Sequence, residues 1–156
     1  MLIQLWLTLL RVAMGWMLLY AGVTKLMNPA WTAAGYLRNA ATFPEFYQWL
    51  AQPEHIAWVN ASNAWGLTLL GVALLLGIGT RIASVLGVAL MMLYYFPVLR
   101  FPYPNAHSYI VDEHIVYALV LLVLAAVDAG RMWGLDGWCA RLPWCRRYRF
   151  LRALLG

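Results

Sequence analysis

Charged side chains are scarce in this 156-residue sequence. Asp, Glu, Lys and Arg make up 11% of the chain, whereas they make up roughly a quarter of an average soluble domain. Hydrophobic residues account for 64% of the sequence, and the mean hydropathy is +0.69. This composition excludes an ordinary water-soluble domain and predicts an integral membrane protein embedded in the lipid bilayer.

Motifs for several kinds of chemistry are also missing. The chain has three histidines and two cysteines, with no Cys-x-x-Cys pair, no zinc-ligand spacing and no glycine-rich phosphate loop. Only His114 is placed to enter the membrane, so neither a haem with two histidine ligands nor a metal is expected within this chain. Cys139 and Cys145 fall in a region expected to be cytoplasmic, where reduced thiols are expected.

Long runs without charge predict the architecture. A bilayer core about 30 Å thick needs about 20 helical residues, and residues 61–79 and 82–99 are two such runs. Residues 3–26 are apolar apart from Arg11 and Lys25, and residues 109–127 form the fourth candidate. We predict one all-α domain over residues 1–156, an integral membrane four-helix bundle followed by a tail at residues 128–156.

The distribution of arginine predicts the orientation. The tail has six Arg, the turn between the second and third spans has Arg81, and the long connection at residues 28–60 has only Arg38. Cytoplasmic segments are rich in Lys and Arg, so we predict a multi-pass protein of the cell membrane with both termini in the cytoplasm. Residues 1–10 hold no Lys or Arg, so the first span is expected to be retained and not removed as a signal peptide.

Three ionisable residues open the fourth span. Asp112, Glu113 and His114 precede a run without charge. Ionisable groups inside a membrane usually face a protein interior, a partner or a water-filled cavity. Two interpretations stay open: the carboxylates begin a helix near the positive end of its dipole, or the three residues form a proton-handling or anion-facing site.

Further polar side chains are predicted at the same outer end of the bundle. They come from three spans and one loop and comprise Lys25, Tyr94, Tyr95, Arg100, His107 and Tyr117. By depth, Lys25 is the best match for Asp112 or Glu113, and we predict an ion pair or a water bridge between them. Lys25 and Arg100 could instead extend to lipid headgroups.

One face of the first span carries both of its charges. Arg11, Gly15, Leu18, Gly22 and Lys25 follow steps of four and three residues, which places them on one side of a helix. Glycine permits close helix approach in membranes, so this stripe is predicted to face the bundle. Arg11 is expected to find a backbone carbonyl, a water or a partner chain, which leaves a homo-oligomer open.

The two segments outside the spans are rich in aromatic or basic residues. The connection at residues 28–60 holds seven aromatic side chains, and Pro44 predicts the start of a short helix. This segment is interpreted as an interfacial aromatic belt or as a lid over the polar cluster. The tail from Pro143 onward is predicted to be a basic amphipathic helix on the membrane surface, without a nucleic-acid recognition motif.

Several short motifs, in order along the chain, resemble the DoxX-like superfamily of four-span membrane proteins. The DoxD branch, the membrane subunit of thiosulfate:quinone oxidoreductase, is the most similar. The resemblance is carried by Arg11 with Gly15, residues 20–25, Asn28-Pro29, residues 79–83, residues 107–117 and residues 130–136. It implies a second redox subunit as partner, quinone as electron acceptor and thiosulfate as the substrate oxidised at the outer face.

The resemblance assigns no roles to individual residues. The types of side chain present are nevertheless compatible with quinone reduction and thiosulfate oxidation. Asp112, Glu113 and His114 are the candidates for proton transfer, and Lys25, Arg11, Tyr94, Tyr95, Arg100, His107 and Tyr117 are the candidates for binding substrate or quinone. The alternative is a non-catalytic membrane scaffold or assembly partner for a redox enzyme. In that case Arg11, Lys25, Asp112 and Glu113 would form ion pairs that fix the bundle.

Overall fold

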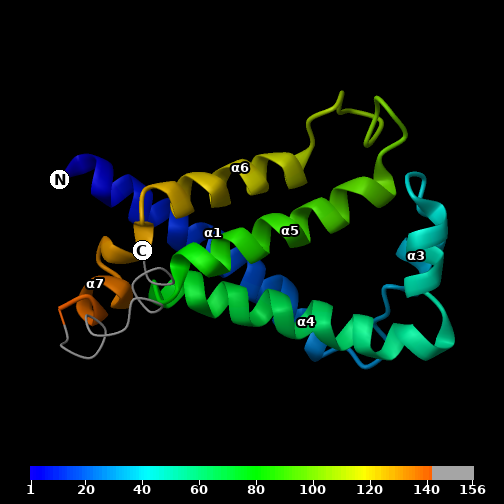
Figure 1. The fold of residues 1–156 in the computed structure, drawn as a ribbon, viewed down its shortest axis with the longest axis horizontal. Helices are drawn as coiled ribbons and strands as arrows, with labels where there is room; N and C mark the ends of the chain where they lie inside the picture. The colour runs from blue at the N-terminus through cyan, green and yellow to red at the C-terminus, as the bar shows by residue number, and fades with distance from the viewer. Residues whose placement is uncertain (142–156) are drawn as a thin grey trace.

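The computed structural model describes residues 1–141, and these are helical with no β-strand, as predicted. The elements in chain order are α1 (Leu2–Leu26), α2 (Ala34–Arg38), α3 (Pro44–Leu50), α4 (Pro53–Leu76), α5 (Thr80–Val98), α6 (Glu113–Ala126), the 3-10 helix η1 (Ala129–Arg131) and α7 (Leu135–Cys139). Figure 1 shows four long helices, shorter helices between α1 and α4 and after α6, and a long loop between α5 and α6.

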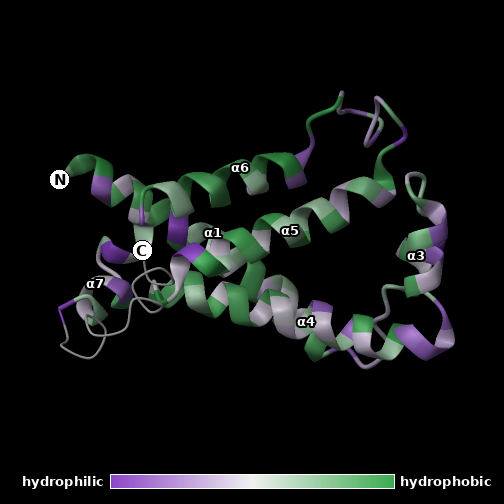
Figure 2. Ribbon diagram, viewed as in Figure 1, coloured by the Kyte–Doolittle hydropathy of each residue, from purple (hydrophilic) through white to green (hydrophobic). Residues whose placement is uncertain are grey.

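Helices α1, α4, α5 and α6 run along the long axis of the molecule and form the bundle (Figure 1). Within the described residues, three of them (α1, α4 and α5) are long and apolar enough to cross a membrane. Helix α6 has 14 residues, which is about 21 Å of helix against a hydrocarbon core of about 30 Å. Hydrophobic residues dominate the middle of these helices, and hydrophilic residues gather towards the ends (Figure 2).

Two predicted span boundaries differ from the structure. Helix α4 begins at Pro53, eight residues before the predicted start at 61, because proline is well accommodated in a first helical turn. Helix α6 begins at Glu113 and not at 109, because the Asp112 side chain caps it by accepting bonds from the backbone N–H groups of His114 and Ile115. Ile110, with φ of 60°, already has a left-handed backbone that a helix would not allow.

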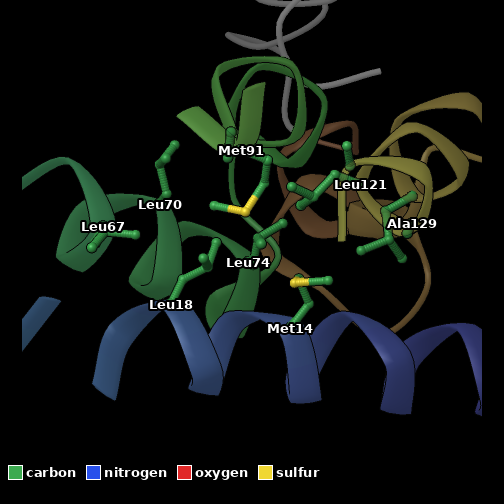
Figure 3. Close-up of a cluster of buried hydrophobic side chains, with 11 residues drawn as sticks. Met14, Leu18, Leu67, Leu70, Leu74, Met91, Leu121 and Ala129 are labelled. Atoms are coloured by element: carbon green, nitrogen blue, oxygen red, sulfur yellow. The ribbon is translucent and has the colours of Figure 1, made fainter. Parts of the chain in front are cut away.

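The apolar core lies between the four bundle helices. Figure 3 shows side chains from α1, α4, α5 and α6 pointing towards one another, among them Met14, Leu18, Leu74, Met91 and Leu121. Leu74 and Leu121 are completely buried. Helix α1 packs mainly against α4, and α5 packs mainly against α6, so the bundle consists of two tightly packed pairs.

The predicted stripe on α1 does face the bundle. Arg11, Gly15, Leu18 and Gly22 are buried, and Lys25 is half-buried. A methyl group added at Gly15 would lie 2.8 Å from the Leu75 backbone nitrogen. The glycines therefore set the close approach of α1 to α4.

Arg11 finds backbone carbonyls at the end of the bundle that holds the N-terminus, η1 and α7. Its guanidinium donates to the carbonyl oxygens of Ala129 at 2.5 Å and Met132 at 3.1 Å. In the same region the buried Asp136 carboxylate accepts from the backbone N–H groups of Gly79 at 2.7 Å and Thr80 at 3.0 Å. Asp136 thus caps the start of α5 from α7, where a negative charge complements the helix dipole.

The C-terminal predictions have a mixed outcome. The amphipathic helix expected from Pro143 onward, together with Cys145, lies outside the described residues. Cys139 ends α7 and is disulfide-bonded. The expectation of a reduced thiol at Cys139 is therefore wrong.

Candidate functional site

A polar pocket of about 450 Å³ lies at the end of the bundle opposite η1 and α7. That volume falls in the range of about 300–1,000 Å³ found for small-molecule sites. Its walls come from α1, the segment before α2, α4, α5 and the start of α6. The side chains that give it its chemistry are Lys25, Trp31, Tyr36, Asn63, Tyr94, Asp112, Glu113 and His114.

Three side chains from three helices form a donor cluster in this pocket. The Lys25 ammonium donates to the Asn63 Oδ1 at 3.0 Å and lies 3.4 Å from the Tyr94 hydroxyl oxygen. The Asn63 Nδ2 donates to the same Tyr94 hydroxyl at 2.6 Å. We call Lys25, Asn63 and Tyr94 the donor triad, and it ties together α1, α4 and α5 next to the cavity.

The predicted ion pair between Lys25 and a carboxylate is not made. Within residues 1–141 the only ion pair joins His114 and Asp112. The ammonium of Lys25 is instead accommodated by the donor triad and by two aromatic faces, with the ring centroids of Trp31 at 4.9 Å and Tyr94 at 5.3 Å. Lys25 therefore shares a pocket with Asp112 and Glu113 while its charge stays uncompensated by direct contact.

Asp112 caps α6, as the first of the two interpretations expects, and it also contacts His114. Its Oδ1 accepts from the backbone N–H groups of His114 at 3.0 Å and Ile115 at 3.2 Å, which caps α6. Its Oδ2 lies 2.7 Å from the His114 Nδ1, and the Asp112 side chain is only 1% exposed. This carboxylate orients the imidazole, which lines the pocket. A Tyr94–His114 ring contact with centroids 5.8 Å apart joins this pair to the donor triad.

Asp112, Glu113 and His114 are also the described residues that could hold a metal ion, since one ligand atom from each lies within 4.8 Å of the others. Both oxygens of Asp112 and the Nδ1 of His114 are already engaged with each other or with the α6 backbone. A metal bound through the His114 Nδ1 would have to displace its contact with Asp112.

The aromatic-rich connection between α1 and α4 (residues 28–60) covers the pocket with the part around α2. Asn60 holds the segment by accepting from the Ala33 backbone N–H at 2.9 Å and donating to the Thr32 hydroxyl at 3.1 Å. The Tyr36 hydroxyl donates to the Tyr94 backbone carbonyl through a short hydrogen bond. Burial, reinforced by neighbouring tyrosines and acids, raises the pKa of Tyr36, so its hydroxyl remains a donor.

Helix α3 is fastened to α5 through a proline. Pro97 has no N–H, so the Leu93 carbonyl loses its usual helical partner. The Tyr47 hydroxyl donates to this carbonyl at 3.3 Å, and burial raises the pKa of Tyr47. Phe46 and Trp49 on α3 remain exposed, so residues 28–60 cover the pocket at α2 and present aromatic side chains outward at α3.

The structure brings half of the ten predicted site residues into the pocket, namely Lys25, Tyr94, Asp112, Glu113 and His114. The others lie elsewhere. Arg11 is at the opposite end, and Tyr117 packs against the apolar core. Tyr95 donates to the Ile110 carbonyl at 2.5 Å and thereby anchors the loop before α6.

The two predicted cations of the α5–α6 loop lie outside the polar pocket. Arg100 is exposed and lines a neighbouring cavity, which shares Val98, Pro104 and Asn105 with the pocket. His107 is exposed, and its backbone N–H donates to the Asn105 side chain. Arg100 therefore lies beside the pocket, and neither Arg100 nor His107 contacts the donor triad.

Among the pocket residues that were not predicted as site residues, Asn63, Trp31 and Tyr36 contribute most to its chemistry. Asn63 was recognisable as a polar residue within an otherwise apolar run, and the structure makes it the centre of the donor triad. Trp31 and Tyr36 had been grouped with the aromatic belt, yet both line the cavity. No sequence periodicity distinguishes them from the aromatic residues that stay exposed.

Comparison with known proteins adds one finding. The family model described as DoxX matches residues 6–100. The match extends from α1 through α5 and includes the whole donor triad, but it ends before Asp112, Glu113 and His114. Neither the curated proteins nor the solved structures include a significant match to the chain.

Proposed function

Because this chain belongs to the DoxX family of membrane proteins, we propose that it is the membrane subunit of a quinone-linked oxidoreductase. The observation that carries the proposal is the convergence of the donor triad and the Asp112–His114 pair on one cavity at the end of an apolar bundle. In this proposal the polar pocket binds the quinone head group.

The donor triad suits the oxygen atoms of a quinone. A quinone carbonyl accepts hydrogen bonds, and the ammonium of Lys25 is a charged donor that strengthens as negative charge develops on that oxygen. Tyr94 offers a hydroxyl beside it. Neither donor is tied to a carboxylate, so both can redirect a hydrogen bond to a bound ligand.

The Asp112–His114 pair suits the protons that the reaction consumes. Reduction of a quinone takes up two electrons and two protons, and histidine exchanges protons near neutral pH. Asp112 holds the imidazole in place through a contact of 2.7 Å. Glu113 is exposed at the rim of the pocket, where it can return protons from water to His114.

Thiosulfate is the proposed electron donor, with a second redox subunit as partner. Two thiosulfate ions lose one electron each and join through a new S–S bond as tetrathionate, while the quinone gains both electrons and two protons. The resemblance of residues 107–117 to the DoxD branch supports this substrate. Arg100, which lines the neighbouring cavity, favours approach of a dianion.

The scaffold alternative requires ion pairs that the described residues do not make. It expects Lys25 to bind Asp112 or Glu113, whereas Lys25 contacts Asn63 and Tyr94. Arg11, at the other end of the bundle, donates to backbone carbonyls and likewise makes no ion pair among the described residues.

Removal of the His114 imidazole tests the proposal. Membranes containing the chain and its co-encoded partner should reduce a quinone analogue when thiosulfate is supplied. We expect His114→Ala to lower this rate about 100-fold, the usual contribution of a general acid. His55→Ala, a histidine on α4 outside the pocket, is the matched control and should retain the rate. Full activity of His114→Ala, or the absence of any thiosulfate-dependent quinone reduction, would reject the proposal.

A further inference from the structure

A second cavity lies between α4 and α5, on the side exposed to lipid. It has a volume of about 330 Å³, and nearly all of its lining is apolar or small, including Ser62, Gly66, Leu69, Ala89 and Leu93. We call it the apolar groove. It exists because α4 packs mainly against α1 and α5 mainly against α6, which leaves the α4–α5 contact sparse.

The residue at position 66 keeps the groove open. A methyl group built at Gly66 would meet no atom within 4 Å. By contrast, Gly71, five residues later on the same helix, is packed against the α1 backbone. Gly66 therefore has no packing role in the described residues, and its lack of a side chain leaves space beside Leu69 and Leu93.

The apolar groove and the polar pocket are neighbours along both helices, although no residue lines both. Ser62 and Leu93 line the groove, and the residues that follow them, Asn63 and Tyr94, belong to the donor triad. Asn63 and Tyr94 are joined by a hydrogen bond of 2.6 Å, which links α4 to α5 at the level where the groove ends. From Ser62 to Leu69 the groove follows about 11 Å of helix.

We infer that the apolar groove holds the first part of the alkyl or isoprenoid tail of the quinone whose head group occupies the polar pocket. This inference rests on the proposed quinone site. A membrane quinone has a polar head and a long apolar tail, and the tail must leave the pocket towards lipid. The groove offers it an apolar path, whereas Lys25, Asp112 and Glu113 line the pocket with charge.

Filling the groove tests the inference. Gly66→Leu and Ala89→Leu place side chains into it from α4 and α5 respectively. Ala13→Leu, at an exposed position of α1 away from the groove, is the matched control. Equilibrium binding in lipid nanodiscs should be measured for a tail-less quinone and for the same quinone with an isoprenoid tail. Because all variants are compared in the same lipid, partition of the tail into the bilayer cancels.

We expect both groove variants to weaken binding of the tailed quinone about fivefold and to leave the tail-less quinone unaffected. The factor is modest because the tail exchanges lipid contacts for protein contacts and does not leave water. Unchanged binding of both quinones would overturn the inference and leave the groove to a lipid acyl chain. Equal weakening of both would also overturn it. If neither quinone binds the wild-type protein, the quinone site itself fails, and the groove assignment fails with it.

Discussion

Arg11 and Lys25 share one stripe of α1 but have different environments. Arg11 is 1% exposed and donates to backbone carbonyls around η1. Lys25 is half-buried and lies between aromatic rings beside a cavity. A planar guanidinium can satisfy several carbonyls at once, whereas an ammonium is a compact charge that can turn towards a ligand. The same stripe therefore holds one cation in a structural role and one beside a cavity, where we propose that it binds a ligand.

Substituting each cation by methionine should separate these roles. Arg11→Met leaves buried carbonyls without a donor and should lower the free energy of unfolding by about 3 kcal/mol. Lys25→Met removes a charge-assisted donor but breaks no ion pair; it should weaken quinone binding about tenfold, or 1.4 kcal/mol, with little change in stability.

Thermal unfolding in detergent and quinone binding would measure the two effects. Arg81→Met, which removes an exposed cation, is the control for loss of charge. If Lys25→Met were the less stable of the two variants, the division of roles would be wrong.

Within the bundle, glycine determines which helices pack tightly. On α4, Gly71 lies against the α1 backbone, where an added methyl group would be 2.3 Å from the Leu19 nitrogen. Gly66 on the same helix faces open space. The two glycines therefore define a packed side and an open side of α4, and the apolar groove lies on the open side.

Alanine at these two positions should have opposite effects on stability. Gly71→Ala forces α1 and α4 apart and should cost about 1–3 kcal/mol. Gly66→Ala meets no atom and improves helix propensity, so it should stabilise the fold by up to about 1 kcal/mol. Thermal unfolding of both variants in the same detergent is the measurement. A Gly71→Ala protein as stable as the wild type would show that the α1–α4 pair can relax without loss.

At the scale of the whole molecule, the two ends of the bundle differ in structure: one is closed by buried hydrogen bonds, and the other surrounds a cavity. Arg11 and Asp136 join α1, η1, α5 and α7 at one end through buried hydrogen bonds. At the other end, the donor triad and the Asp112–His114 pair surround a cavity that the segment around α2 covers. One end fixes the bundle, and the other presents groups that a ligand can engage.

Much of this arrangement could be predicted from the sequence. The uncharged runs predicted the helices, and the spacing of Arg11, Gly15, Leu18 and Gly22 predicted the buried face of α1, since both depend on local periodicity. The start of α6 could also be predicted from the sequence, because Asp before a helical run is a common N-cap. It was misplaced because apolar residues before it extended the expected span.

Contacts between distant segments could not be predicted in this way. Lys25 turns to Asn63 and Tyr94, which are 38 and 69 residues away in the chain, and Asp136 caps a helix that begins 56 residues earlier. Such pairs depend on how the helices are arranged, and neither periodicity nor charge reports that arrangement. An ion pair was predicted for Lys25 on the basis of charge alone. Nothing in the sequence indicated that two aromatic faces and an amide would accommodate the ammonium.

The orientation of the bundle in the membrane is the last prediction. Arg81 and Arg131 lie at the end that holds η1, and the sequence that follows is rich in arginine, so we expect this end in the cytoplasm and the pocket outside. The disulfide of Cys139 argues the other way, because disulfides favour oxidising compartments. We give more weight to the charges, since several arginines contribute to them.

Cysteine labelling distinguishes the orientation expected from the arginines from the one expected from the Cys139 disulfide. In a background where Cys139 and Cys145 are replaced by serine, single cysteines are introduced at Arg38 and Arg131, both exposed. A membrane-impermeant maleimide applied to intact cells should label Arg38→Cys at once and Arg131→Cys only after permeabilisation. Insertion of each variant is checked by labelling in detergent. The reverse pattern would place the polar pocket on the cytoplasmic side, and thiosulfate would then have to reach it from the cytoplasm.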